Sequence, residues 1–279
     1  MTLTIRQADE QDLAVMIAWA GREGWNPGDD DIKPFFEADR SGYWLAEVDG
    51  AVAACISLVH HQPSFAFLGF YIADPRFRGQ GIGHRLWQDV IGRSSATTIG
   101  LDGVVAQQAN YIKSGFAYAH ANWRYGGVIA EGSVDLEAQP IPVGRMIDVI
   151  AYDARHNPSP RPRFISQWLT DTPTRQSACI TRNGEIVALG TIRACLEGHK
   201  IGPLFSDDEE TADRLFRHLV AKAGGGMIFL DVPEPNGPAR QLCERYGMAP
   251  FFETARMYRG LAPELPLRNI FGITTFELG

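Results

Sequence analysis

The feature that most constrains the fold is a repeated order of elements along the 279-residue chain. Each half is predicted to contain a hairpin, with its turn at Asp49-Gly50 in the first half and Asn183-Gly184 in the second. A strand, a helix, a short buried strand and a second helix then follow in both halves, and Leu101-Asp102 matches Leu230-Asp231. Self-similarity in a fixed order indicates repeated units, with a chance likeness of two α/β halves as the alternative. We therefore predict an α/β (α+β) fold of two similar domains.

The junction between the halves is rich in proline, with Pro residues at positions 140, 142, 158, 160 and 162. We place the first domain at 1–132, the second at 142–262 and a tail at 263–279. Within the second domain, 144–153 is predicted to be a strand and 161–171 a helix. The tail is apolar, so we expect it to dock on a sheet or in the groove between the domains.

Composition excludes several kinds of partner. The net charge is −7, whereas proteins that bind nucleic-acid backbones over a wide surface are normally basic, so no nucleic-acid partner is expected. The longest apolar run, 51–59, is far shorter than the ~20 residues that a membrane span needs, so no membrane partner is expected. The four cysteines form no C-x-x-C pair, which predicts buried reduced thiols, no metal site and a cytoplasmic protein. A monomer and a homodimer are both left open.

A glycine-rich turn stands between a strand and a helix in the first half. The segment FYIADPRFRGQGIGHRLW, Phe70–Trp87, contains Gly79, Gly81 and Gly83 directly after Arg78. Glycines let the backbone approach a ligand closely and let successive N–H groups point into one concavity. The N-terminus of a helix also carries a partial positive charge. Together with the guanidinium, these features predict a site for a phosphate or pyrophosphate group.

The spacing of the glycines narrows the kind of ligand. A P-loop requires Gly-Lys-Ser/Thr and a dinucleotide turn requires G-x-G-x-x-G, and neither pattern is present. The pattern R-x-x-G-x-G, from Arg78 to Gly83, strongly resembles the acetyl-coenzyme A (acetyl-CoA) binding motif of the GNAT superfamily of N-acetyltransferases. The later segment ANYIKSGF and the order of elements are also similar to the family over residues 3–130. The resemblance implies acetyl-CoA as cofactor and, in each domain, a mixed, mostly antiparallel twisted sheet flanked by helices.

The resemblance also implies roles for individual residues. The residues implied to contact the cofactor are Ile72 and Ala73, whose backbone would line the pantetheine, and Arg78, Gly79, Gln80, Gly81, Ile82 and Gly83, whose N–H groups would bind the pyrophosphate. Tyr111 matches the frequent general acid of the family, and a phenol with a pKa of about 10 is protonated at neutral pH. Packing is its alternative role. Family members often carry Asn seven residues before this Tyr, where this chain has Val104, so the cofactor's contacts with this helix are left open.

Candidates for the base and for the acceptor site are less specific. The possible bases are Glu23, Glu47, His60, His61 and Asp102, each with a structural role as its alternative, and water could replace a single base. Trp25 and Asn26 fall in the helix-loop region where family members bind acceptors, so we predict that they face the substrate. Trp123 and Tyr125, on the closing strands, are predicted to form the other wall, with core packing as the alternative.

The second half departs from the motif at the matching place. It reads FSDDEETADRLF, 205–216, where carboxylates crowd the first turn of the predicted helix. Acidic residues suit a helix N-terminus but would repel a pyrophosphate. We therefore predict a second domain with the fold of the family and without its cofactor site. This arrangement resembles a bacterial tandem-GNAT family.

The sequence thus predicts an N-acetyltransferase that transfers the acetyl group of acetyl-CoA to a primary amine by direct attack in a ternary complex. A small-molecule amine is the favoured acceptor, because a second domain would wall the cleft. The alternatives are a protein lysine or N-terminal acetyltransferase and an acyl-CoA-binding sensor without turnover.

Overall fold

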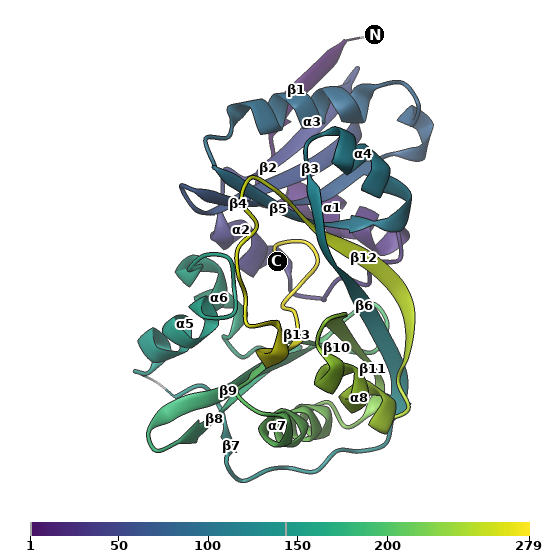
Figure 1. Ribbon diagram of the computed structural model, residues 1–279. Coiled ribbons are helices and arrows are strands. Elements are labelled where there is room, and N and C mark those ends of the chain that lie inside the picture. The colour runs from purple at the N-terminus through teal and green to yellow at the C-terminus, as the bar shows by residue number, and fades with distance from the viewer. Residues whose placement is uncertain (1, 143) are drawn as a thin grey trace.

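The computed structural model describes residues 2–142 and 144–279, and its first half supplies one edge of a large sheet (Figure 1). The elements of this half are β1 (Leu3–Gln7), α1 (Asp12–Arg22), α2 (Ile32–Ala38), β2 (Tyr43–Val48), β3 (Ala51–Gln62), β4 (Phe65–Ala73), α3 (Ile82–Arg93), β5 (Thr98–Val104), α4 (Gln108–Lys113) and β6 (Ala117–Ile129). Short 3-10 turns, Pro75–Phe77 and Val105–Gln107, precede α3 and α4.

The second half repeats this order, as the sequence predicts. Its elements are β7 (Ala138–Gln139), α5 (Met146–Ala154), α6 (Pro162–Trp168), β8 (Arg175–Arg182), β9 (Glu185–Ala194), β10 (His199–Ser206), α7 (Glu209–Lys222), β11 (Gly226–Pro233), α8 (Gly237–Arg245) and β12 (Ala249–Arg259). Both halves therefore run β-α-α-β-β-β-α-β-α-β, and a short strand in the tail, β13 (Ile270–Gly272), follows a 3-10 turn at Leu267–Asn269. The predicted α/β class, with a mixed and mostly antiparallel sheet, is confirmed.

One secondary-structure prediction is wrong. The segment 144–153 was expected to be a strand, but Met146–Ala154 forms helix α5. Val149, Tyr152 and Asp153 are its buried residues, and their spacing of three and four positions is that of one helical face. A short apolar run such as Val149-Ile150-Ala151-Tyr152 is compatible with a strand or a helix. Packing against the rest of the second half selects the helix.

The two halves exchange their closing strands. In residues 2–142 and 144–279, thirteen strands form one sheet, in which twelve follow the order β1-β2-β3-β4-β5-β12-β6-β11-β10-β9-β8-β7. Strand β12 of the second half pairs with β5 of the first, and β6 of the first half pairs with β11 of the second. Figure 1 shows β6 and β12 side by side, running from one half to the other. The exchange brings residues of the second half to the edge of the first.

A buried ion pair stabilises each exchanged strand. Arg124 on β6 donates from Nε and Nη2 to the carboxylate of Asp231 on β11, at 2.6 and 2.8 Å. Arg256 on β12 makes the corresponding pair with Asp102 on β5, with both distances 2.8 Å. All four side chains are at most 5% exposed. The matched Leu-Asp dipeptides of the two halves therefore supply the carboxylates of two equivalent pairs.

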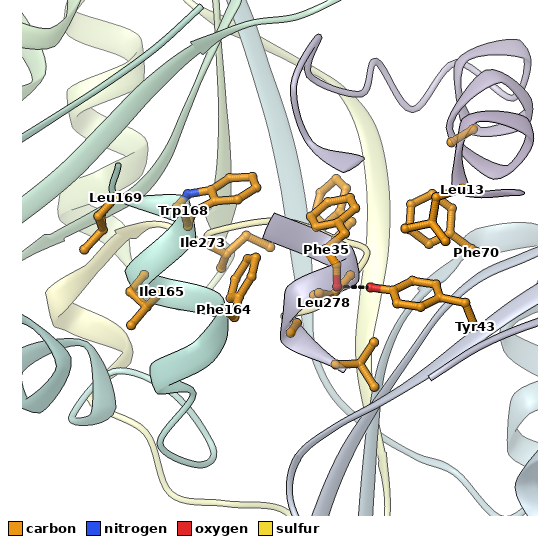
Figure 2. Packing of buried hydrophobic residues seen from close by; sticks show 14 of the residues in the cluster. Leu13, Phe35, Tyr43, Phe70, Phe164, Ile165, Trp168, Leu169, Ile273 and Leu278 are labelled. Carbon is orange, nitrogen blue, oxygen red and sulfur yellow. Dashed lines mark hydrogen bonds between the residues drawn. The ribbon is translucent and has the colours of Figure 1, made fainter. Parts of the chain in front are cut away.

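A shared aromatic core joins the halves. Phe35 on α2 stacks on Trp168 of α6, with ring centroids 5.8 Å apart, and Phe164 contacts both rings. Figure 2 shows this group together with Phe70 and Tyr43, whose hydroxyl donates to the Phe35 carbonyl oxygen at 2.6 Å. Helix α2 of the first half and α6 of the second are thus packed through one continuous cluster.

The tail is part of this interior. Strand β13 pairs antiparallel with β10, and residues 270–279 are all buried. Figure 1 shows the last residues, in yellow, lying between the two halves. The carbonyl oxygen of Leu278 is 2.9 Å from Nε2 of His61 on β3, so the tail contacts both halves.

No helix within the described ranges is long and apolar enough to cross a membrane. All four cysteines are buried and free.

Acid should destabilise the protein through His120 on β6, which is 9% exposed. Burial, followed by the nearby charge of Arg256, lowers the pKa of His120 to about 4. The unfolded chain binds a proton near pH 6.5, so stability is lost as the pH falls from about 6.5 to about 4. We expect this residue to account for about 2 to 3 kcal/mol of the loss in unfolding free energy.

Urea unfolding at pH 7 and pH 4.5 measures this effect. The His120→Gln variant should lose correspondingly less stability on acidification than the wild type. The exposed His84→Gln variant is the control and should lose as much as the wild type. Equal acid losses in all three proteins would remove His120 from the explanation.

Candidate active site

The site begins at a break in strand β4. This strand pairs in parallel with β5 from Phe65 to Leu68, and the described pairing ends there. Its register with β3 shifts just beyond, and Phe70 has a φ of 48°, a left-handed conformation that a bulky residue rarely adopts. The shift is a bulge, which bends a strand and leaves backbone groups without ladder partners. Strand β4 therefore presents backbone to the opening beside β5.

The glycine turn follows directly. Gly79 and Gly81 have φ values of 77° and 76°, and Gly81 is the N-cap of the twelve-residue helix α3. A Cβ at either position would meet no atom within 4 Å, so the backbone conformation and not crowding requires glycine there. A Cβ at Gly83 would come 3.2 Å from the Tyr71 hydroxyl, so at this position the close approach matters. The turn leaves the first N–H groups of α3 available to an anion.

The turn and the bulged strand open onto one cavity of about 690 Å³. Its walls come from β4, the turn, the end of β5 and the segment leading into α4, together with residues of the second half. The lining is mostly apolar and includes Leu68, Phe70, Ile72, Phe77 and Leu101. A cavity of this size, with the glycine turn and apolar side chains in its lining, fits a ligand with a phosphate end and an apolar end.

Seven of the eight residues predicted to contact the cofactor line this cavity: Ile72, Ala73, Arg78, Gly79, Gly81, Ile82 and Gly83. Gln80 does not line it; this residue is exposed, and its side-chain amide donates to the Arg76 carbonyl oxygen at 3.0 Å. Arg78 donates to the Ala73 carbonyl oxygen at 2.9 Å and forms an ion pair with Glu23. The guanidinium is therefore held at the rim, beside the turn.

The structure places Tyr111 on the cavity wall. It lies on α4, and its ring stacks on Trp87 of α3 with centroids 5.5 Å apart. Burial raises the pKa of Tyr111 above its usual value of 10. The hydroxyl is therefore protonated at neutral pH, as a proton donor requires.

Two of the five candidate bases, Glu23 and Asp102, line the cavity. Asp102 pairs with Arg256 and also accepts a hydrogen bond from the Asn122 amide at 2.8 Å. Its carboxylate is therefore occupied by structural contacts. Glu23 is paired only at the partly exposed rim, with Arg78.

The remaining three candidates serve the structure elsewhere. Glu47 pairs with Arg6 at 2.8 Å, and the His60 ring lies 3.4 Å from Asp39 and 2.9 Å from the Ser94 hydroxyl. His61 contacts the tail at Leu278.

Among the four predicted acceptor residues, Trp25 lines the cavity and Asn26 does not. The Asn26 side chain instead bonds to both the backbone N–H and the carbonyl oxygen of Glu197, each at 2.9 Å. Trp123 and Tyr125 also lie away from the cavity and pack in the core of the second half. Because side chains alternate along β6, the residue between them, Arg124, has the opposite orientation.

Three lining residues come from the second half and were not among the predicted site residues: Phe252 and Thr254 on β12 and Phe276 in the tail. They lie far from the motif along the chain, and only the strand exchange and the docking of the tail bring them to the site. No local pattern in the first half could have indicated them.

The corresponding opening in the second half is filled by protein. Strands β10 and β11 pair in parallel only from His199 to Ile201, as β4 and β5 do over a similar length. Beyond that point, β13 pairs with β10, and the N–H of Ile273 donates to the Asp231 carbonyl oxygen on β11 at 2.9 Å. A Cβ at Gly272 would lie 2.5 Å from the Leu230 side chain, which shows how closely the tail fits.

The helix after this opening is also closed to anions. Asp208 is the N-cap of α7, and its carboxylate accepts from the Thr211 N–H at 2.7 Å. Glu209 and Glu210 follow in the first turn. The chain's own carboxylates thus occupy the position that the glycine turn keeps free in the first half.

Comparison with known proteins agrees with this architecture. A family model described as "Acetyltransferase (GNAT) family" matches residues 11–112, and one described as "Acetyltransferase (GNAT) domain" matches residues 149–272. A protein called holothin acyltransferase, from Pseudoalteromonas sp. (strain SANK 73390), is 29% identical over 281 residues, which cover 100% of this chain and 95% of that protein.

Two solved structures share the fold along nearly the whole chain. A putative acetyltransferase from Pyrococcus horikoshii has a TM-score of 0.78 at 19% identity. The match covers 99% of this chain and 96% of the chain of that protein. A tandem GNAT protein from the clavulanic acid biosynthesis pathway has a TM-score of 0.64 at 12% identity. The match covers 94% of this chain and 100% of the chain of that protein.

Proposed function

The chain is an acyltransferase of the GNAT family with two GNAT domains in tandem, and we propose that it acetylates the primary amine of a small molecule. The observation that carries the proposal is one cavity that contains the glycine turn, the bulged strand β4, Tyr111 and aromatic side chains of both halves. Acetyl-CoA would be the acyl donor, and acetyl donor and amine would occupy the cavity together.

The residues present fit acetyl-CoA. The N–H groups at the start of α3, beside Gly79 and Gly81, suit a pyrophosphate, and the edge of β4 beyond Leu68, where the pairing with β5 has ended, suits the amide groups of a pantetheine arm. Bound in this way, acetyl-CoA supplies a thioester carbonyl carbon for the amine to attack. The bulge at Phe70 interrupts the ladder beside the cavity, and a backbone N–H freed there would stabilise charge on the carbonyl oxygen.

Proton transfers are assigned to two side chains on the cavity. As the new C–N bond forms and the C–S bond breaks, Tyr111 donates its proton to the departing thiolate sulfur. Glu23 lies at the rim with a half-exposed partner, Arg78, whereas Asp102 is held by a buried arginine, so Glu23 is the acceptor for the proton that the amine loses, directly or through water. The tyrosinate regains its proton from solvent after the thiol leaves.

The lining of the cavity favours a small acceptor. Side chains of Trp25, Phe252 and Phe276 wall it, and they come from three separate segments that the fold packs together. Aromatic side chains that line a concave site exclude a folded protein surface better than they exclude a small amine. Holothin, the compound in the relative's name, belongs among the acceptors to be tried.

A thiol-release assay with acetyl-CoA tests the proposal. The panel should contain holothin, 2-phenylethylamine, 1,3-diaminopropane, and peptides with a lysine or a free N-terminus. We expect release with at least one small amine and none with the peptides. Release with peptides alone would indicate a protein acetyltransferase, and acetyl-CoA binding without release across the panel would indicate a sensor.

A further inference from the structure

Three aromatic residues of the cavity share one buried neighbour, Arg124. Trp25 belongs to the loop between α1 and α2, Phe252 to β12 and Phe276 to the tail. They are distant in sequence, and we call them together the aromatic wall. Phe252 and Phe276 contact each other, with ring centroids 6.0 Å apart.

Arg124 contacts each member of the aromatic wall. Its guanidinium carbon lies 4.8 Å from the ring centroid of Phe276 and 5.6 Å from that of Phe252. Its Nη1 donates to the carbonyl oxygen of Trp25 at 2.7 Å. The other two nitrogens bind Asp231, which fixes the plane of the guanidinium. The side chain is 1% exposed, so every one of these contacts is made in the interior.

The second half holds the Trp25 end of the wall at further points. Lys200 on β10 is buried and donates from Nζ to the carbonyl oxygens of Trp25 and Asn26, at 3.2 and 2.8 Å. The loop also pairs by backbone with the β9–β10 connection, where Leu196 N–H donates to the Pro27 carbonyl oxygen at 3.2 Å. Two buried cations, Arg124 and Lys200, therefore converge on the backbone of Trp25.

We propose that Arg124 is the positioning residue of an acceptor-binding surface formed by the aromatic wall, and that this surface selects amines carried on a flat, apolar body. This inference rests on the proposed function. The guanidinium charge is neutralised by Asp231 and covered by the phenyl rings, so the wall offers ring faces rather than an ionic contact. A flat apolar group gains contact with such rings, whereas a second ammonium against the wall would lose water without gaining a free carboxylate, because Glu23 and Asp102 already pair with arginines.

Selectivity between two small amines tests the wall. Wild type should prefer 2-phenylethylamine to 1,3-diaminopropane by at least tenfold in kcat/KM. In Phe276→Leu and Phe252→Leu, the KM for 2-phenylethylamine should rise about tenfold, while the Kd of acetyl-CoA stays within about twofold. Phe251→Leu is the matched control, because Phe251 is the exposed neighbour on β12 and lies outside the wall.

The Arg124→Lys variant tests positioning. It keeps a positive charge beside Asp231 but loses the planar contact with the two rings and the fixed bond to Trp25. We expect the KM for 2-phenylethylamine to rise about tenfold with kcat changed less than threefold. Where this variant folds poorly, the Phe276→Leu result carries the test. Unchanged KM in both variants, or an equal loss for the two amines, would overturn the proposal.

Calorimetry separates this inference from the proposed function. If no amine releases thiol, 2-phenylethylamine should still bind to the CoA-loaded wild type and more weakly to CoA-loaded Phe276→Leu. Turnover of 1,3-diaminopropane in preference to 2-phenylethylamine would refute the proposed selectivity of the aromatic wall and leave the proposed transferase function intact. If 2-phenylethylamine did not bind to the CoA-loaded protein, the proposed role of the aromatic wall in acceptor binding would be refuted directly.

Discussion

Replacing Gly81 by glutamate is expected to abolish detectable binding of acetyl-CoA. Gly81 has a φ of 76° and caps helix α3, at the position where N–H groups converge. A Cβ there would meet no atom within 4 Å, so the fold should survive with about 1–2 kcal/mol of backbone strain. The added carboxylate would occupy the place of the pyrophosphate and repel it. Isothermal titration calorimetry should show one site per chain in the wild type and at least 100-fold weaker binding in the variant.

Gly184→Glu is a matched control for this experiment. Gly184 lies in the β8–β9 turn, has a φ of 82° and also has no atom within 4 Å of a built Cβ. The same charge and similar strain are introduced far from the cavity, so binding should equal that of the wild type. Undiminished binding by Gly81→Glu would mean that the turn is not the phosphate site. Two sites per wild-type chain would contradict the closed opening at β13.

The glycine turn could be predicted from the sequence because its function depends on backbone conformation over a few consecutive residues. The spacing from Arg78 to Gly83 indicates the same local geometry wherever it occurs, and the structure has left-handed glycines at that place. The repeated order of elements could be predicted for a related reason, since hairpin turns and helical periodicity are local. The prediction of a strand at helix α5 is wrong because a short apolar run is compatible with both a strand and a helix.

Long-range pairing could not be predicted in this way. Strands β6 and β12 each close one half, but no local pattern indicates that they exchange partners. The exchange explains why Trp123 and Tyr125 pack in the second half and why Phe252 reaches the cavity. The limits 1–132, 142–262 and 263–279 remain a prediction. A cut at 132 would separate β6 from β11, the strand with which it pairs.

The residues of the acceptor site also cannot be predicted from the chemical type of a side chain alone. Aromatic residues on β6 were expected to contact the substrate, whereas the charged residue between them, Arg124, contacts the rings that line the cavity. A buried arginine is an unusual element of an apolar wall, and the carboxylate of Asp231 on the neighbouring strand compensates its charge. That partner is 107 residues away along the chain.

The Tyr111→Phe variant should lose roughly 100-fold in kcat for acetyl transfer, a loss within the usual range for removing a general acid. The change removes only the hydroxyl, because the stacked contact with Trp87, 5.5 Å between centroids, and the edge contact with Phe116, 6.4 Å, depend on the ring. The Kd of acetyl-CoA should stay within about twofold of the wild-type value. Steady-state thiol release and calorimetry on the same preparation separate the two effects.

Tyr71→Phe distinguishes a specific proton donor from any phenol in the cavity. Tyr71 also lines the cavity, and burial raises its pKa too, but its hydroxyl lies against the glycine turn at Gly83. A large loss in this variant with none in Tyr111→Phe would transfer the role of donor to Tyr71. Because burial holds the pKa of Tyr111 above 10, the wild type should keep its advantage over Tyr111→Phe up to about pH 10. An advantage that disappears below pH 9 would mean that the phenol is not the acid.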